Sequence, residues 1–216
     1  MTTPKKLILV GAGGAGLEAL LVARRMGNWT PVGFADDAPA LAGAIVDGLP
    51  VLGTVASVVT DPALRDCHVH FAVGGNALRE RWSRLFGGAG FEPATLVDPS
   101  SVIAPSASVG AGSYVAPHAF VGPEARVGRH VLVNVGASIG HHSEMGDFGQ
   151  VCPGGRVSGN ARLGVGAFVG SNGVVAPGIQ VGEWATVGAA SLAARDVPPR
   201  FSAIGVPARM VGVPGT

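Results

Sequence analysis

The sequence predicts a small α/β domain followed by a parallel β-helix, and three observations carry this prediction. The chain opens with an aliphatic strand, a glycine-rich turn and a helical stretch, which together begin a βαβ unit. Its second half repeats every six residues, a period that fits neither a helix at about 3.6 residues nor a strand alternating at about 2. Glycine is abundant, at 35 of 216 residues, whereas aromatic residues make up only 6%. This composition is typical of a solenoid.

The repeat begins at Val97, and every sixth residue from there is aliphatic or Met. The repeated positions are Val97, Ile103, Val109, Val115, Val121, Val127, Val133, Ile139, Met145, Val151, Val157, Leu163, Val169, Val175, Val181 and Val187. The residues two before and one after each position are usually small. We expect three hexapeptides to form one triangular coil that climbs about 4.8 Å, with the repeated residue pointing inward. We expect the glycines to take the left-handed conformations of the corners.

The first domain, residues 1–96, is predicted to be a Rossmann-like half-domain. Its predicted strands cover residues 6–10, 32–35, 51–52 and 70–73, and its predicted helices cover residues 15–26 and 76–87. The first helix should end at Gly27, and residues 95–97 should lead into the β-helix of residues 97–193. In the second helix we expect Leu78, Trp82, Leu85 and Phe86 on one face, with Arg79 elsewhere.

A G-x-G-x-x-G pattern at residues 11–16 lies between a strand and a helix, where backbone N–H groups and the helix dipole favour phosphate. Asp36 and Asp37 follow at the end of the second strand, as in dinucleotide sites. An NAD-binding module is therefore one interpretation, and a turn that binds nothing is another. One half-domain lacks the second half of a dinucleotide fold, so a single nucleotide diphosphate fits better. We expect Gly74 and Asn76 to form a second side of that pocket.

Bulk properties narrow the class of protein. The net charge is +1 with scattered basic residues, which argues against nucleic acid as a partner. Cys67 and Cys152 are predicted to be reduced thiols of a cytoplasmic protein. We expect no signal peptide and no membrane span, because glycines and Glu18 interrupt the first apolar run. The tail, residues 194–216, loses the repeat and should pack on the last coil, covering its open edge.

Polar residues gather in one part of the predicted coils. They are Asn134, His141, His142, Ser143, Glu144 and Asp147. His141 is two residues past an inward position, so it should project outward from a corner, where a histidine can act as a general base near neutral pH. His118 and His130 are expected to be surface or subunit-contact residues. A zinc site is not expected, because no histidines are spaced so that their nitrogens would converge on one ion.

At these residues the sequence resembles the bacterial nucleotide-sugar acetyltransferases of the left-handed β-helix superfamily. The likeness is greatest to the UDP-4-amino-sugar N-acetyltransferases of bacillosamine synthesis, with the sialic acid O-acetyltransferases as relatives. The stretches that carry it are VGAGGAGLE, FADD, AVGGNALRERW, DPSSVIAPSASVG, NVGASIGHHSEMGDF and GVPARMV. Together they span nearly the whole chain.

The resemblance implies a homotrimer with acetyl-CoA in a groove between neighbouring prisms and no metal. It also implies that His141 is the general base in direct acetyl transfer to the amino group of a nucleotide-linked 4-amino-4,6-dideoxy sugar, in surface glycan synthesis. Residues implied to contact the nucleotide sugar are Gly13, Gly14, Ala15, Asp36, Asp37 and Gly74, to which Asn76 is added. Those implied to line the CoA groove are Gln150, Ser171, Gly188 and Ala189.

Three positions depart from the family pattern. His142 stands where an acid often follows the catalytic histidine, so Glu144 or Asp147 is expected to orient His141. Gln150 replaces a second histidine, and Ala15 replaces the histidine of the first-domain turn. O-acetyl transfer to a sialic acid or related sugar, and a β-helix scaffold without turnover, remain alternatives.

Overall fold

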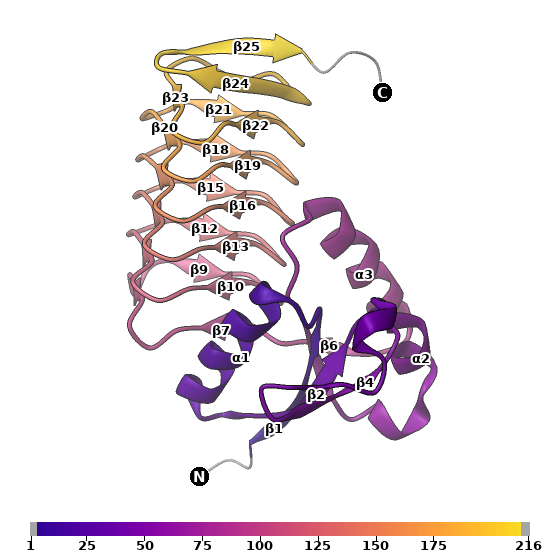
Figure 1. The fold of residues 1–216 in the computed structure, drawn as a ribbon. Coiled ribbons are helices and arrows are strands. Elements are labelled where there is room, and N and C mark those ends of the chain that lie inside the picture. The colour runs from indigo at the N-terminus through magenta and orange to yellow at the C-terminus, as the bar shows by residue number, and fades with distance from the viewer. Residues whose placement is uncertain (1–3, 213–216) are drawn as a thin grey trace. The chain divides into compact units, whose positions relative to one another are not determined.

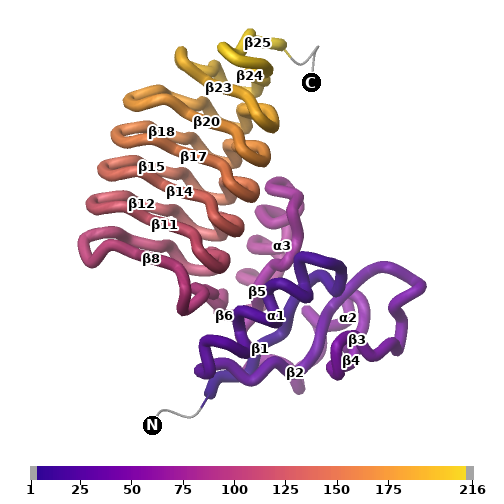
Figure 2. Tube along the Cα trace, turned by 60° about the vertical axis from the view of Figure 1, so that its left-hand side comes forward, coloured from indigo at the N-terminus to yellow at the C-terminus, as the bar shows by residue number. Residues whose placement is uncertain are grey.

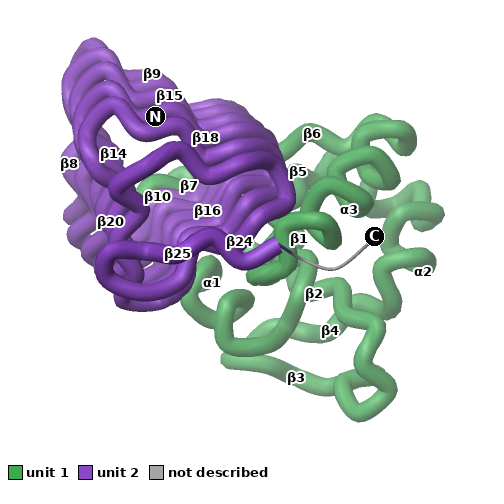
Figure 3. Tube along the Cα trace, turned by 90° about the horizontal axis from the view of Figure 1, so that it is seen from above, with its two compact units in different colours: residues 1–99 green, residues 100–216 purple. Residues whose placement is uncertain are grey.

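The computed structural model describes residues 4–212. The chain divides into two compact units, residues 1–99 and residues 100–216, which Figure 3 shows in different colours. This division falls a few residues after the boundary expected from the repeat.

The first unit is an α/β domain built on a sheet with the strand order β3-β4-β2-β1-β5-β6 (Figure 1). The strands are β1 (Lys5–Val10), β2 (Trp29–Ala35), β3 (Ile45–Val46), β4 (Leu49–Gly53), β5 (His68–Phe71) and β6 (Glu92–Pro93). All neighbouring pairs are parallel except β3 and β4. Residues 7–10 of the central strand β1 are completely buried, as its aliphatic run predicts.

Three helices accompany this sheet: α1 (Gly14–Met26), α2 (Val55–Thr60) and α3 (Asn76–Gly88). Short 3-10 turns lie at Pro39–Leu41 and Pro62–Leu64, and β7 (Leu96–Val97) ends the unit. Helix α1 ends at Gly27 in the left-handed conformation, φ 70°, as predicted. Trp82 and Phe86 of α3 pack with Phe71 of β5 in an apolar cluster that also includes Val55 and Val58 of α2.

Of the four residues predicted to form the apolar face of α3, two are buried and two are exposed. Trp82 and Phe86 are buried, but Leu78 and Leu85 are 37% and 43% exposed, and Arg79 is buried with 1% of its surface exposed. The Arg79 guanidinium donates hydrogen bonds to the Val73 carbonyl and to the Asn76 side chain, both at 2.9 Å. These bonds give the buried guanidinium hydrogen-bond partners, on a residue that the helical pattern placed away from the apolar face.

The second unit is a β-helix of two-residue strands stacked in three parallel sheets, as the ladder of coils in Figures 1 and 2 shows. The first face consists of β8 (Val102–Ile103), β11 (Phe120–Val121), β14 (Ser138–Ile139), β17 (Arg156–Val157), β20 (Val174–Val175) and β23 (Leu192–Ala193). The second face consists of β9 (Ser108–Val109), β12 (Arg126–Val127), β15 (Glu144–Met145), β18 (Arg162–Leu163) and β21 (Gln180–Val181). The third face consists of β10 (Tyr114–Val115), β13 (Leu132–Val133), β16 (Gln150–Val151), β19 (Phe168–Val169) and β22 (Thr186–Val187).

The repeated aliphatic residue is the second residue of each of these strands, so the six-residue count places every strand in register. Each inward residue pairs with the residue 18 positions along, for example Val127 with Met145. From Val115 to Val187 these inward side chains are at most 4% exposed. The predicted fold class, an α/β domain followed by a left-handed parallel β-helix, is confirmed.

The expectation for the glycines needs correction. Most corners place a left-handed residue third after the inward one. It is glycine, as expected, at Gly112, Gly136, Gly154, Gly166 and Gly178, but at other corners it is not, as at His142 with φ 57°. Glycines directly after the inward residue have no positive φ. A Cβ at Gly110 would instead lie 2.5 Å from the backbone of Gly128 in the next coil. Close stacking of the coils, rather than corner conformation, requires glycine at these positions.

The corners that follow the second face carry an aromatic column. The ring of His130 stacks on Phe148 with centroids 5.5 Å apart and planes 1° apart, and it also covers Gly112. His130 is only 3% exposed, so the expectation that it lies on the surface is wrong; His118 is exposed. The stacked rings make this corner part of the packing of the β-helix.

The chain after the last coil adds to the third face. Strand β24 (Phe201–Gly205) pairs in parallel with β22, and β25 (Ala208–Gly212) pairs antiparallel with β24. Val197 forms a bridge to Val181 of the second face. These pairings cover the backbone edge that the last coil would otherwise leave open.

His68 opens β5, with its ring against the edge of Trp29 at a centroid distance of 5.3 Å. Its Nδ1 is buried and has no hydrogen-bond partner within residues 4–212. Burial lowers the pKa of His68, the Lys5 ammonium lowers it further, and Glu92 opposes the shift.

We predict that His68 makes the domain less stable in acid. Folded His68 binds a proton less readily than His68 in the unfolded chain. The stability that neutral His68 contributes is therefore complete above about pH 6.5 and is lost as the pH falls through the lower pKa of the folded state. In thermal unfolding, the wild-type melting temperature should therefore fall more between about pH 7 and pH 5 than that of His68→Phe, which keeps a ring against Trp29. Equal pH dependence in both proteins would contradict this assignment.

We also predict that Gly110→Ala destabilises the β-helix by about 1–3 kcal/mol, the usual cost of overpacking, because its Cβ would meet the Gly128 backbone. The matched control is Ala104→Gly, at the same place in the repeat on the first face, which should cost no more than about 1 kcal/mol. Urea unfolding of both variants measures the difference. A Gly110→Ala protein as stable as the control would show that the coils can separate at little cost.

Candidate functional site

Three loops meet at one edge of the first-unit sheet, where β1, β2 and β5 end. The Gly11 amide donates to the Ala35 carbonyl at 2.8 Å, and the Ala72 amide donates to the Val10 carbonyl at 2.8 Å. The Ala12 amide donates to Asp36 Oδ2 at 2.7 Å. These bonds hold the loops that follow the three strands side by side. The N-termini of α1 and α3 lie in two of these loops, and neither helix has an acidic residue in its first turn.

The glycines of residues 11–16 have two separate roles. A Cβ at Gly16 would overlap the Gly11 carbonyl oxygen, and one at Gly11 would lie 2.7 Å from the Ala72 carbonyl oxygen. Gly11 and Gly16 are therefore required for close packing. A Cβ at Gly13 or Gly14 would meet nothing within 4 Å, and the same holds for Gly74 on the neighbouring loop. Backbone is thus open at Gly13, Gly14 and Gly74, which is where an anion would approach.

Both carboxylates of the acidic pair bind backbone amides of their own domain. Asp36 Oδ1 accepts from the Ala38 amide at 2.8 Å while its other oxygen accepts from Ala12. Asp37 Oδ1 accepts from the Val55 amide, at the start of α2, at 2.8 Å. The structure therefore gives Asp36 and Asp37 a role in shaping the loops around the open glycines. Any ligand contact would come in addition to these bonds.

Asn76 begins α3, and a hydrogen bond from a residue of the same helix fixes its side chain. Its side-chain oxygen accepts a hydrogen bond from the buried Arg79, which also binds the Val73 carbonyl. Arg79 thus fixes both ends of the loop that contains Gly74. The sequence signal for this role is weak, because an arginine three residues into a helix usually faces solvent.

His141 and His142 occupy the corner between the first and second faces, directly after β14. Both side chains are exposed, and their Nδ1 atoms are 3.1 Å apart, within hydrogen-bond distance. The two rings are nearly perpendicular, at 83°. The edge of the His141 ring lies over Gly159 in the next coil, where a Cβ would lie 2.5 Å from its Nε2. At this corner the exposed imidazole of His141 packs on Gly159 and is hydrogen-bonded to the imidazole of His142.

The acids near this corner are engaged elsewhere. Glu144 forms an ion pair with Arg126 in the preceding coil at 3.2 Å. Asp147 Oδ1 accepts a hydrogen bond from the Arg129 amide at 2.8 Å. The remaining two members of the polar cluster also bind backbone: Ser143 donates to the Ser158 carbonyl at 2.8 Å, and Asn134 accepts from the Val135 amide at 2.7 Å. Of the cluster, His142 is the residue whose side chain is bonded to His141.

The four residues expected to line a CoA groove lie on the third face and at its far corner. Gln150 is in β16, only 7% exposed, and its Nε2 donates to Cys152 Sγ at 3.4 Å. Ser171 and Ala189 follow β19 and β22 at the same corner of adjoining coils, where the Ala190 amide donates to the Ser171 carbonyl at 2.8 Å. Gly188 is between β22 and that corner. In one chain these residues and His141 belong to different corners of the prism.

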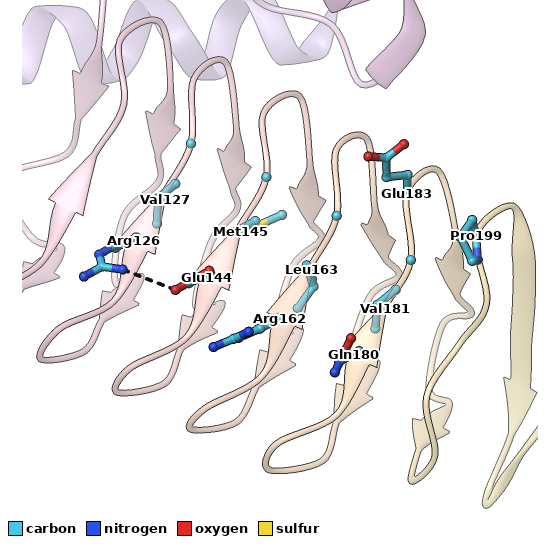
Figure 4. A pocket seen from close by; sticks show the side chains of 14 residues that line it. Arg126, Val127, Glu144, Met145, Arg162, Leu163, Gln180, Val181, Glu183 and Pro199 are labelled. Atoms are coloured by element: carbon cyan, nitrogen blue, oxygen red, sulfur yellow. Dashed lines mark hydrogen bonds and ion pairs between the residues drawn. The ribbon is translucent and has the colours of Figure 1, made fainter.

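The second face carries a groove of about 610 Å³, shown in Figure 4. Four polar side chains line one side of it, stacked at intervals of one coil: Arg126, Glu144, Arg162 and Gln180. The glycine directly after each of these strands also lines it: Gly128, Gly146, Gly164 and Gly182. Of the predicted site residues only Glu144 lies in this groove. The signal that sequence reasoning missed is the long polar residue, charged in three of the four coils, that recurs immediately before the inward position in this column.

Within residues 4–212, no group of three His, Cys, Asp or Glu side chains is arranged to hold a metal ion. None of the helices in that range is both long enough and apolar enough to cross a bilayer.

Residues 6–86 match the family model of the PglD N-terminal domain. The acetyltransferase domain of PglB from Neisseria gonorrhoeae FA1090 has the same fold, with a TM-score of 0.91 and 29% identity over 96% of this chain and 100% of that chain. That domain has also been solved in complex with acetyl coenzyme A. PerB from Caulobacter crescentus, solved with CoA and GDP-perosamine, has a TM-score of 0.89 and 29% identity over 96% of this chain and 97% of its own.

Among curated proteins, a serine acetyltransferase of Salmonella typhimurium is 39% identical over 64 residues. The match spans 29% of this chain and only 23% of that enzyme.

The two kinds of glycine in residues 11–16 lead to a prediction. Gly16→Ala should lower the free energy of unfolding by about 1–3 kcal/mol, because its Cβ would overlap the Gly11 carbonyl. Gly14→Ala is the matched control, in the same turn of α1 but with open space around the new Cβ, and alanine is the better helix former. Gly14→Ala should therefore be as stable as the wild type or slightly more so. If thermal unfolding shows the same loss of stability in Gly16→Ala and Gly14→Ala, Gly16 is not required for close packing.

Proposed function

We propose that the chain is a hexapeptide-repeat nucleotide-sugar acetyltransferase that acetylates the amino group of a nucleotide-linked 4-amino-4,6-dideoxy sugar, a function supported by its PglD-type N-terminal domain and by its fold. The acetyl donor is acetyl-CoA, and the product serves surface glycan synthesis. We place this reaction in the cytoplasm. The observation that carries the proposal is His141, an exposed imidazole held over Gly159 by its own coil and by His142.

His141 supplies the base that amine acylation needs. As the sugar nitrogen attacks the thioester carbon, the imidazole Nε2 takes the proton that the nitrogen must lose. The C–N bond forms, the C–S bond breaks, and the CoA sulfur leaves with a proton, so the amine and acetyl-CoA become an acetamide and free CoA thiol. The transfer is direct and needs no covalent enzyme intermediate, because His141 holds only the proton.

The first unit provides the nucleotide site. Gly13, Gly14 and Gly74 expose backbone at the edge where α1 and α3 begin. Two helix N-termini without acidic residues favour a diphosphate. Asp36 and Asp37 keep the surrounding loops in place through Ala12, Ala38 and Val55, and Asn76 is fixed by Arg79. Ala15, beside the open glycines, completes the turn and leaves room that a histidine would fill.

The second unit provides the acetyl-CoA site in a homotrimer. Gln150, Ser171, Gly188 and Ala189 share the third face and its corner, while His141 is on the corner between the other two faces. A base on one corner can meet a donor bound along another face only when a second prism brings them together. The groove of the second face is lined by glycines and runs past β15, the strand after His141, so it adds a channel for the pantetheine arm of acetyl-CoA bound to the neighbouring prism.

We predict that the protein releases thiol from acetyl-CoA with one member of a panel of UDP-, GDP- and dTDP-linked 4-amino-4,6-dideoxy sugars. His141→Ala should lower kcat by at least about 100-fold, the usual contribution of a general base. His118→Ala, at an exposed corner three coils before Ser171, is the matched control and should keep wild-type kcat. Thiol release is followed with a chromogenic disulfide.

The panel also contains free sialic acid, because a hydroxyl acceptor would use the same base. Release with sialic acid alone would replace N-acetyl by O-acetyl transfer. Wild-type release that survives in His141→Ala would contradict the assignment of the base. No release with any acceptor, in protein that binds a nucleotide diphosphate, would contradict the enzyme and favour a scaffold.

A further inference from the structure

The two neighbouring imidazoles share one hydrogen bond, and this limits their protonation states. Their Nδ1 atoms are 3.1 Å apart, and the rings meet at 83°. A neutral imidazole carries a proton on one nitrogen and a lone pair on the other. The bond therefore requires that one residue has its proton on Nδ1 and that the other presents a lone pair there.

The backbone on either side holds the pair in place. The His142 amide donates to the Pro123 carbonyl in the preceding coil at 2.9 Å. The His141 carbonyl accepts from the Asn160 amide in the following coil at 2.9 Å. His142 has φ 57°, so its side chain leaves the chain from a left-handed corner, next to that of His141. Both residues are thus fixed by coils above and below.

The direction of the bond follows from the position of the other nitrogen. Nε2 of His141 lies above Gly159, where there is no side chain to cover it. Nε2 can take a proton only if it carries none, and in a neutral ring the proton is then on Nδ1. His141 is therefore the donor and His142 the acceptor. The opposite arrangement would protonate Nε2 of His141 and remove its basic lone pair.

The nearby acids do not compete for this role. Glu144 is paired with Arg126, and Asp147 accepts from the Arg129 amide. A carboxylate is the usual partner of a catalytic histidine, since it accepts from Nδ1–H and fixes the ring and its tautomer. At this corner the accepting atom is a histidine nitrogen.

We propose that His142 is the positioning residue of His141: its Nδ1 accepts the hydrogen bond from Nδ1–H of His141 and holds that ring in the tautomer whose Nε2 is the base. The proposal rests on the proposed function for the role of His141. When Nε2 takes the proton from the amine, His141 keeps its Nδ1–H, and the bond to His142 becomes charge-assisted. A neutral partner leaves the positive charge on His141 instead of pairing it with a carboxylate.

Substitutions at His142 test whether a side chain that accepts a hydrogen bond from His141 is needed at this position. His142→Asn and His142→Glu both offer an oxygen to His141 Nδ1–H, and asparagine also tolerates the left-handed backbone. Both variants should keep kcat within about 10-fold of the wild type. His142→Phe offers no acceptor and should lower kcat on the order of 100-fold, as misplacement of a reacting group does, with KM values unchanged.

His118→Phe is the matched control. His118 is also an exposed histidine at a left-handed corner, with φ 58°. The same substitution there imposes the same backbone strain and adds the same ring, without touching His141. It should leave kcat at the wild-type value and lower the melting temperature by about as much as His142→Phe does. An equal loss of kcat in both phenylalanine variants would overturn the proposal by making the effect one of corner strain.

The tautomer can be measured without substrate. In protein labelled with ¹⁵N-histidine, long-range proton–nitrogen NMR distinguishes protonated from unprotonated ring nitrogens, and His141→Gln identifies the signals of His141. We expect Nδ1–H in the wild type and in His142→Asn, and a shift toward Nε2–H in His142→Phe. An Nε2–H tautomer of His141 in the wild type would overturn the proposal, as would a His142→Phe protein with unchanged tautomer and kcat. Absence of thiol release by the wild type would instead overturn the proposed function, because the tautomer is measured separately.

Discussion

The stacking of one coil on the next is the constraint on which the second half of this protein depends. Each coil lies close enough to bond the backbone above and below, as Gly128 does to Met145 and Gly146 does to Leu163. This spacing requires glycine wherever a Cβ would meet the next coil, and it fixes each residue over the one 18 positions away. A glycine beside a functional residue then has a chemical consequence. Gly159 has no side chain, so the His141 ring can lie over it.

The same periodicity explains how much of the structure can be predicted from the sequence. A six-residue count from Val97 locates every two-residue strand up to Val187, because an error of one residue would turn an aliphatic side chain outward. The first domain is less regular, and the sequence pattern did not predict α2. Its residues VASVVT are mostly β-branched or small, and only the Thr54 side chain, which accepts from the Ser57 amide, marks its start.

Side-chain partners are harder to predict than strands, since they depend on contacts between residues far apart in sequence. Glu144 and Asp147 are near His141 in sequence, yet each binds the coil below, at Arg126 and Arg129. By its position in the helix Arg79 resembles a surface residue, but in the fold it binds the carbonyl of Val73 and the side chain of Asn76. His130 is drawn into the β-helix by the ring of Phe148 one coil away. In each case the deciding neighbour is in another turn of the structure.

The arrangement of the prism also bears on why the activity would require more than one copy of the chain. A triangular coil has three corners, and a side chain on one corner cannot reach a ligand on the opposite face of the same prism. His141 is on the corner after the first face, and Ser171 and Ala189 are on the corner after the third. If His141 is the base and Ser171 and Ala189 bind the donor, as proposed, they would act together only across an interface between prisms. Association of prisms would then form the active site itself, and loss of association would remove acetyl transfer while leaving each chain folded.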